Sequence, residues 1–278
     1  MISKKDIQVF GGKHHILLHE SEYIFLLPHP DLRKYISNYT ITFPPKEISD
    51  RYTIMPHGSA TLVISNNTKN LYVELFGPIT KPTIVGNKST EMLVIIEFQP
   101  AGLYALTGIN QSELTDETFS FESVNLALSR LLSEAVEKAE NISELVTSLD
   151  MILLENMYTT FHPQFSTVFQ SMINCAGNTT IRKLSDDIHY SERQLNNIFK
   201  QHVGVSAKPF SRLIRINTAI RLLNNCRNSI TLVSDLTGFH DLPHFIHDFK
   251  SVCGVTPQEY RNNISDFYSE IAKFDGIL

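Results

Sequence analysis

The feature that most limits how this 278-residue chain can fold is an internal repeat in its last third. Aligning Thr180 with Ser229 brings identical or similar residues together, with an offset of one residue in the middle of the repeat. Such a repeat indicates that one small structural unit is used twice. The matched pairs are Thr180 and Ser229, Ile181 and Ile230, Ser185 and Ser234, Asp186 and Asp235, Phe199 and Phe249, Lys200 and Lys250, Gly204 and Gly254, and Val205 and Val255.

Each copy has the pattern of two short helices joined by a tight turn. A Thr or Ser at the start of each copy can accept a hydrogen bond from the unpaired N–H groups of a first helix. In the first copy the second helix opens with Ser191 and Gln194, which have the spacing of a capping box. In the second copy Asp241 can cap the helix, and Pro243 falls in the first turn, where a missing N–H costs little.

A helical projection at about 100° per residue separates a buried face from an outward face on each second helix. The apolar residues expected to be buried are Leu195, Ile198 and Phe199 in the first copy and Leu242, Phe245, Phe249 and Val252 in the second. The residues expected to point outward are Arg193, Asn196, Asn197 and Lys200 in the first copy and Pro243, His244, His247, Lys250 and Ser251 in the second.

A short helix that carries another across a tight turn, with a polar outer face on the second, is a helix-turn-helix unit. The second helix of such a unit enters the major groove of DNA. Arg193 can read guanine O6 and N7, and Asn196 or Asn197 can pair with adenine. His244 and His247 can donate to or accept from base edges and phosphates. The repeat therefore predicts double-stranded DNA as a partner.

Basic and hydroxyl side chains beside the two reading helices are expected to contact the phosphate backbone of DNA. Substitution of Lys208, Arg212 or Arg215 should weaken binding to all sequences, and Thr256 near Gly254 can hold a phosphate. The full set expected at the DNA is Ser191, Arg193, Asn196, Asn197, Lys200, Lys208, Arg212, Pro243, His244, His247, Lys250 and Thr256.

The segment between the copies, residues 208–225, is predicted to be one continuous helix. A helix of about 16 residues spans roughly 24 Å, and the flanking units would hold the two reading helices near one DNA turn, about 34 Å, apart. Both helices could then enter adjacent major grooves. The apolar side of this segment consists of Phe210, Leu213, Ile214, Ile220 and Leu223.

The charge of the chain is unevenly distributed. The net charge of the whole chain is −5. Residues 1–162 contain 12 Lys and Arg against 19 Asp and Glu, a net charge of −7. Residues 180–261, which contain the repeat, have 11 basic against 7 acidic residues, a net charge of +4. The basic part is modest and coincides with the predicted DNA-binding part.

The first 121 residues are expected to form a β-rich domain. "LYVELF" alternates apolar and polar residues as a half-buried strand does, and "MLVIIEF" is apolar enough to be buried on both faces. Short strands at this spacing are typical of an antiparallel barrel or sandwich. The expected strands are residues 23–27, 39–43, 60–65, 71–76 and 92–98.

Residues 122–162 are expected to form two amphipathic helices separated near 138–141. Their apolar stripes can pack on the β-rich domain, on each other, or on a second subunit in a homodimer, and the sequence leaves these alternatives open. The stripes consist of Leu128, Leu131, Leu132, Ala135 and Val136, and then Ile142, Leu145, Val146, Leu149, Ile152, Leu153 and Met157.

Residues 163–265 resemble the DNA-binding domain of the AraC/XylS family of transcription regulators. The residues that carry the resemblance are "SERQLNNIFKQHVGVSAKPF", "R-x-N-x-A-I-R-L-L" and "GFHDLPHFIHDFKSVCGVTPQEYR". The resemblance implies that Arg193, Asn196 and Asn197 occupy base-contacting positions of the first reading helix. The corresponding positions of the second are Leu242, Pro243, His244 and His247. The second helix lacks Arg, Gln or Asn at these positions, and the first has Asn where the family often has Arg. Discrimination between DNA sequences is therefore expected to depend more on Arg193 and on DNA shape.

The resemblance extends to the N-terminal part through "LPHPDLRKYISNY", "FGPITKP" and "FQPAGLYALTG". It implies a cupin-like sensor or dimerisation domain over residues 1–121, with residues 122–162 as dimerisation or linker helices. The expected fold class is α+β, an antiparallel β barrel or sandwich followed by an all-α domain. Further implications are a small-molecule or protein effector, contact with RNA polymerase, and activation of transcription.

Composition favours a cytoplasmic protein without a membrane anchor. No apolar run approaches the roughly 20 residues that span a bilayer, and the N-terminus lacks the apolar core of a secretory signal. The three cysteines, Cys175, Cys226 and Cys253, fit neither a disulfide scaffold nor a zinc site.

No cofactor, metal or catalytic activity is expected. Histidines 14, 15 and 19 with Glu20 lack the usual cupin ligand spacing, and His240 precedes the helix that carries His244 and His247. The chain lacks a nucleophile triad, a phosphate-binding glycine loop and paired carboxylates. Three alternatives to a DNA-binding regulator are a cupin-type metalloenzyme with a DNA-binding tail, a regulator acting through protein contacts, and an adaptive-response repair regulator. The last would need N-terminal cysteines, which are absent from residues 1–174.

Overall fold

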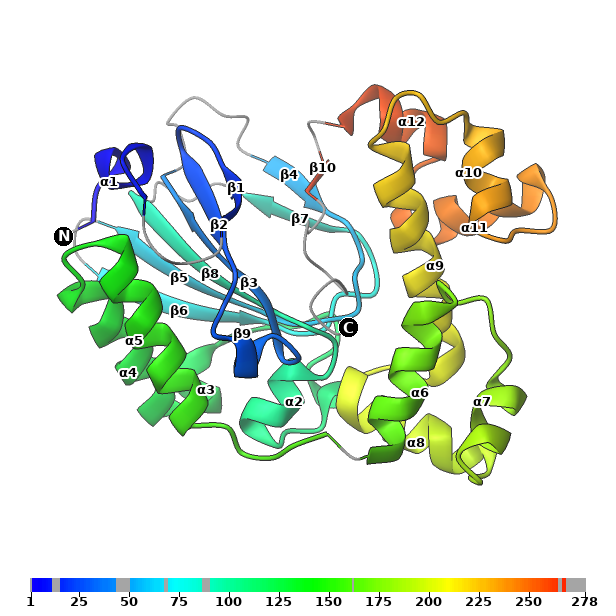
Figure 1. The fold of residues 1–278 in the computed structure, drawn as a ribbon, viewed down its shortest axis with the longest axis horizontal. Helices are drawn as coiled ribbons and strands as arrows, with labels where there is room; N and C mark the ends of the chain where they lie inside the picture. The colour runs from blue at the N-terminus through cyan, green and yellow to red at the C-terminus, as the bar shows by residue number, and fades with distance from the viewer. Residues whose placement is uncertain are drawn as a thin grey trace.

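The structure is a computed structural model that describes residues 2–11, 16–43, 51–67, 70–86, 91–161, 163–264 and 267–268. It has an N-terminal part built on antiparallel β-sheet and a helical C-terminal part that spans residues 163–264 (Figure 1). This order confirms the predicted α+β class.

A seven-stranded antiparallel sheet forms the centre of the N-terminal part. The strands follow the order β1-β2-β3-β8-β5-β6-β9. Their bounds are β1 Ile16–His19, β2 Tyr23–Leu26, β3 Ile36–Thr42, β5 Thr61–Asn67, β6 Asn70–Phe76, β8 Met92–Phe98 and β9 Thr118–Ser120. The five predicted strands correspond to β2, β3, β5, β6 and β8, which lie side by side in this sheet.

A smaller three-stranded sheet has the order β10-β4-β7. Here β4 (Arg51–Ile54) pairs antiparallel with β7 (Thr83–Gly86) and parallel with β10 (Phe267–Tyr268). The pairs among the strands of residues 16–120 are antiparallel, as expected, and the one parallel pair comes from β10, which lies outside the predicted β-rich domain. The sequence did not predict these three strands or β1 and β9, which have two to four residues each, so few that an apolar–polar period shows only weakly.

Helices cover one face of the large sheet. After α3 (Phe121–Val124), α4 (Leu126–Lys138) and α5 (Ile142–Glu155) lie along the sheet (Figure 1). Leu132, Val136, Leu145 and Leu149 are buried in one core with residues of β3, β5 and β8. The apolar stripes therefore pack within the chain, while Leu131, expected in the stripe, is 41% exposed because it lies on the outer side of α4.

The remaining N-terminal helices are short. They are α1 (Lys4–Gln8), the 3-10 turns η1 (Pro30–Leu32) and η2 (Gln111–Glu113), and α2 (Gly102–Thr107). Of these, α2 and η2 lie next to the helical part (Figure 1).

The C-terminal part contains two lobes at opposite ends of one long helix, α9 (Ala207–Leu223) (Figure 1). Lobe 1 is defined as α6, α7 and α8, and lobe 2 as α10, α11 and α12. Their bounds are α6 Pro163–Asn174, α7 Ile181–Asp187, α8 Glu192–Val203, α10 Ile230–Leu236, α11 Leu242–Cys253 and α12 Pro257–Asn262. The predicted helix between the repeats is present, and the five residues predicted for its apolar side are buried.

The two parts of the molecule share a contact that the sequence did not indicate. Met55 and Ala101 from the N-terminal part are buried in the core of the helical part. Asn217 of α9 donates from Nδ2 to the Pro56 carbonyl oxygen at 2.8 Å. The segment boundaries 1–121, 122–162 and 163–265 stay a prediction, and the second core crosses them.

Of the helices in the described ranges, none combines the length and the apolar character needed to cross a bilayer.

Candidate nucleic-acid interface

Side-chain caps fix where the two reading helices begin. At the start of α8, Gln194 N donates to Ser191 Oγ at 3.2 Å, and Ser191 N donates to Gln194 Oε1 at 2.9 Å. At the start of α11, His244 N donates to Asp241 Oδ1 at 2.8 Å. Both predicted caps are confirmed, and Pro243 lies in the first turn of α11, where it removes no intrahelical bond.

The C-terminal ends of both reading helices use glycine. Gly204 and Gly254 have φ of +93° and +76°, a left-handed conformation that a side chain disfavours. Gly204 has a further constraint, because a Cβ there would lie 2.2 Å from Thr115 Oγ1 of the N-terminal part. The predicted turn role of the two glycines is confirmed.

On α8 the predicted outward residues divide into two groups. Arg193, Asn197 and Lys200 are exposed, while Leu195 and Phe199 are fully buried on the opposite side. Asn196 is only half-buried, and its Oδ1 accepts a hydrogen bond from Ala207 N at 3.1 Å. Asn196 therefore ties the reading helix to the first turn of α9. The eleven-residue separation of the pair gave no local signal of this contact.

On α11 the predicted outward residues Pro243, His244, His247 and Lys250 are exposed. The His247 side chain is 82% exposed and that of His244 is 48% exposed. Phe245 and Phe249 are fully buried, and Leu242 is half-buried rather than buried.

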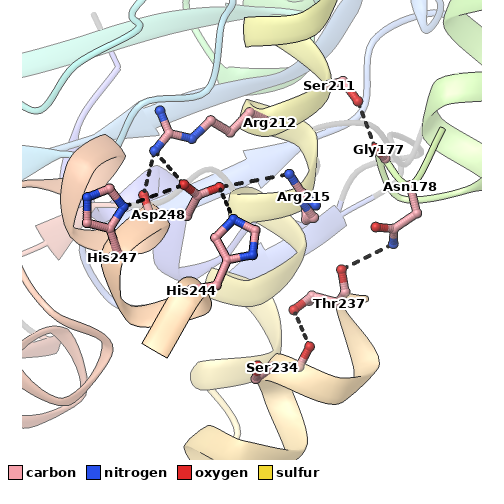
Figure 2. Close-up of polar contacts among 10 residues, drawn as sticks. All are labelled: Gly177, Asn178, Ser211, Arg212, Arg215, Ser234, Thr237, His244, His247 and Asp248. Atoms are coloured by element: carbon pink, nitrogen blue, oxygen red, sulfur yellow. Dashed lines mark hydrogen bonds and ion pairs between the residues drawn. The ribbon is translucent and has the colours of Figure 1, made fainter. Parts of the chain in front are cut away.

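An acidic residue that the sequence analysis did not single out lies among these groups. Asp248, with a side chain only 13% exposed, accepts from Arg212 at 2.8 Å and lies 3.9 Å from Arg215 (Figure 2). Imidazole nitrogens of His244 and His247 lie 3.9 and 4.0 Å from its carboxylate oxygens. Asp248 thus joins the second reading helix to α9.

The two arginines of this network are partly withdrawn from solvent. Arg215 lies over the Phe239 ring at 4.5 Å. Burial lowers the pKa of the Arg215 guanidinium, and the Asp248 carboxylate opposes this change. Arg212, predicted as a phosphate contact, is half-buried and paired with Asp248, whereas Lys208 in the first turn of α9 is exposed.

Thr256 has a local structural role in addition to its predicted phosphate contact. Its Oγ1 accepts from Glu259 N at 3.2 Å, and Glu259 Oε2 accepts from Thr256 N at 2.7 Å. This is a capping box for α12.

Within the described ranges no group of three or more His, Cys, Asp or Glu residues is arranged to hold a metal ion. His19 Nε2 lies 2.6 Å from the Ile7 carbonyl oxygen, and His240 Nδ1 lies 3.2 Å from Asp241 Oδ2. His14 and His15 lie outside the described residues.

Two helix-turn-helix units joined by one helix, each presenting a capped second helix with a polar outer face, define the class of this C-terminal domain. A family described as helix-turn-helix domain matches residues 184–263. The domain belongs to the AraC/XylS type of helix-turn-helix domain, as its motifs indicated. A second family, described only as a domain of unknown function (DUF6597), matches residues 25–120, so the cupin-like resemblance stays a prediction.

Curated relatives match this region. The chain is 30% identical over 112 residues to the HTH-type transcriptional regulator ArgR of Pseudomonas aeruginosa, covering 40% of this chain and 34% of that protein. It is 28% identical over 95 residues to the arabinose operon regulatory protein of Escherichia coli, covering 34% of this chain and 32% of that protein. The chain thus spans about a third of the length of the curated relatives it matches.

Among solved structures, ToxT from Vibrio cholerae is similar over 82% of this chain and 93% of its own, with 17% identity and a TM-score of 0.39.

Proposed function

We propose that this chain is a DNA-binding transcription regulator whose α8 and α11 enter adjacent major grooves of one duplex. The observation that carries the proposal is the pair of capped helices, each buried on its apolar side and exposed on its polar side, at the two ends of α9. The 17 residues of α9 span about 25 Å at 1.5 Å per residue. The lobes extend beyond both ends, which is compatible with a separation near one DNA turn.

The two reading helices offer different chemistry to DNA. Exposed Arg193 and Asn197 on α8 suit bidentate contacts to guanine and adenine. On α11, His244, His247 and Lys250 suit phosphates and single hydrogen bonds to bases. Lobe 1 is therefore proposed to supply most of the direct base readout, while lobe 2 supplies position and sensitivity to DNA shape.

The N-terminal part would control DNA binding through thermodynamic linkage between effector binding and the arrangement of the two parts. An effector or partner that prefers one arrangement of the two parts shifts the DNA-competent population by its difference in affinity. The contact of α2 and η2 with α8 supports this proposal, because it joins the N-terminal part to a reading helix. A small-molecule or protein effector, a homodimer, contact with RNA polymerase and activation of transcription rest on the family resemblance.

The test is a selection of bound sites from random duplexes with the full chain, followed by affinity measurements on the selected site. Arg193→Ala should cost about 1–3 kcal/mol of binding and relax selectivity at one base pair. Arg182→Ala, which changes an exposed arginine of α7, is the matched control and should preserve selectivity at that base pair. Unchanged affinity and selectivity of the Arg193→Ala protein would show that α8 does not lie in the groove.

A further inference from the structure

The two lobes contact each other directly at the middle of α9. The Asn178 side chain, in the turn between α6 and α7, donates from Nδ2 to the Thr237 carbonyl oxygen at 3.1 Å. Thr237 is fully buried in the turn between α10 and α11. Figure 2 shows this bond crossing from lobe 1 to lobe 2.

The turn that holds Asn178 is seated on α9. Ser211 Oγ donates to the Gly177 carbonyl oxygen at 2.7 Å. A Cβ at Gly177 would lie 2.3 Å from the Ser211 carbonyl oxygen, so the backbones of the turn and of α9 are in close contact. Arg212, next to Ser211, and Arg215, one turn further along α9, hold Asp248 of lobe 2. The same stretch of α9 therefore fixes both lobes (Figure 2).

A comparison of the two repeats indicates why position 238, next to Asn178, is a glycine. The turn of lobe 1 has His189 where lobe 2 has Gly238, and the two residues have φ of +56° and +71°. Their hydrogen bonds also correspond, since His189 N donates to the Asp186 carbonyl and Gly238 N to the Asp235 carbonyl. A histidine occupies this backbone conformation in lobe 1, so the conformation alone does not demand glycine in lobe 2.

Close approach of Asn178 supplies the missing reason. A Cβ on Gly238 would lie 2.7 to 2.9 Å from Oδ1, Nδ2 and Cγ of Asn178. A side chain there would displace the Asn178 amide, whereas the equivalent His189 of lobe 1 is exposed. Glycine at 238 and asparagine at 178 thus form one contact between the lobes.

We propose that Asn178 is a positioning residue that, with Gly238, sets the separation and angle of α8 and α11 and thereby the spacing of DNA half-sites that the protein accepts. The proposal rests on the two-groove function proposed above. One extra base pair between half-sites moves them apart by about 3.4 Å and rotates them by about 35°. Two lobes held rigidly lose binding affinity when the half-site spacing changes, whereas two loosely held lobes lose less.

The experiment uses the full chain and a duplex selected by the wild-type protein, with one base pair inserted or removed between the two footprinted half-sites. Wild-type protein should lose about ten-fold or more in affinity on insertion, similar to a mismatched base pair. Asn178→Ala should bind the original duplex nearly as well but lose at least about three-fold less on insertion. Gly238→His, which places the lobe 1 residue in lobe 2, should displace Asn178 and flatten or shift the spacing profile.

Asn174→Ala is the matched control, because Asn174 is exposed at the end of α6 and should retain the wild-type profile. A wild-type spacing profile in both Asn178→Ala and Gly238→His would overturn the positioning role and leave the function intact. Absence of paired half-sites for the wild-type protein itself would overturn the two-groove function and, with it, this inference.

Discussion

At the scale of single residues, Asp248 is the least expected feature of the side that we propose faces DNA. A carboxylate on a reading helix repels phosphate, and here it is held within 4.0 Å of two arginines and two histidines. It therefore reduces the positive charge that α9 and α11 present together. Asp248 is one of the seven acidic residues that keep the net charge of residues 180–261 at a modest +4.

Asp248→Asn should strengthen binding to non-specific duplex DNA. The substitution removes one negative charge and frees Arg212 for a phosphate, so the slope of log K against log salt should steepen by about one unit. Fluorescence anisotropy over a series of salt concentrations measures this slope. Asp235→Asn, an equal charge change at an exposed residue of α10, is the control and should give a smaller change. Equal slopes for the Asp248→Asn and wild-type proteins would contradict the screening role.

At the scale of elements, a buried carboxylate joins α5 to the sheet. Asp150 Oδ1 accepts from Tyr39 OH at 2.9 Å and from His29 N at 3.0 Å, and Asp150 is only 8% exposed. Burial, together with the Asp150 carboxylate beside it, raises the pKa of Tyr39 well above its ordinary value. The phenol therefore stays protonated and keeps donating to Asp150. One side chain thus fixes α5 against β3 and against the segment before η1.

Asp150→Ala should lower the free energy of unfolding of the N-terminal part by about 1–3 kcal/mol, because the buried Tyr39 hydroxyl and the part-buried His29 N–H lose their acceptor. Urea denaturation followed by circular dichroism measures the change. Thr147→Ala, on the exposed side of the same helix, should change it by less than about 0.5 kcal/mol. Equal effects of the two substitutions would mean that solvent replaces Asp150 as acceptor.

At the scale of the whole molecule, the N-terminal part holds the far end of the first reading helix. The Tyr104 and His202 rings lie 4.1 Å apart, and Gln201 Nε2 donates to Tyr104 OH at 3.2 Å. Arg193 lies at the other end of α8 and is exposed. The N-terminal part therefore contacts α8 without covering its proposed DNA-reading residues.

Tyr104→Ala should separate the unfolding of the two parts. Loss of the ring removes the contact with the His202 ring as well as the bond to Gln201, and calorimetry should then resolve two transitions or a wider separation between them. Tyr104→Phe keeps the ring and should give an intermediate result. An unfolding profile unchanged by Tyr104→Ala would show that the other contacts, including buried Met55 and Ala101 and the Asn217–Pro56 hydrogen bond, couple the parts without Tyr104.

The sequence by itself determined the local features of this protein. It determined the caps at Ser191 and Asp241, the buried face of α9 and the left-handed turns at Gly204 and Gly254. It also determined most of the buried faces of α8 and α11, where Ile198 and Leu242 are half-buried rather than buried. These features depend on residues within one or two helical turns of each other, so their period and spacing can be read along the chain.

Only the tertiary structure decided which distant groups meet. It placed Asn196 on the start of α9, Asp248 between two arginines, and Asn178 against the turn of the other lobe. It also resolved the open alternative for the apolar stripes, which pack within the chain. A stripe or a polar side chain specifies what it needs to contact but not which surface supplies it. That choice depends on how whole elements pack, and packing couples residues tens of positions apart.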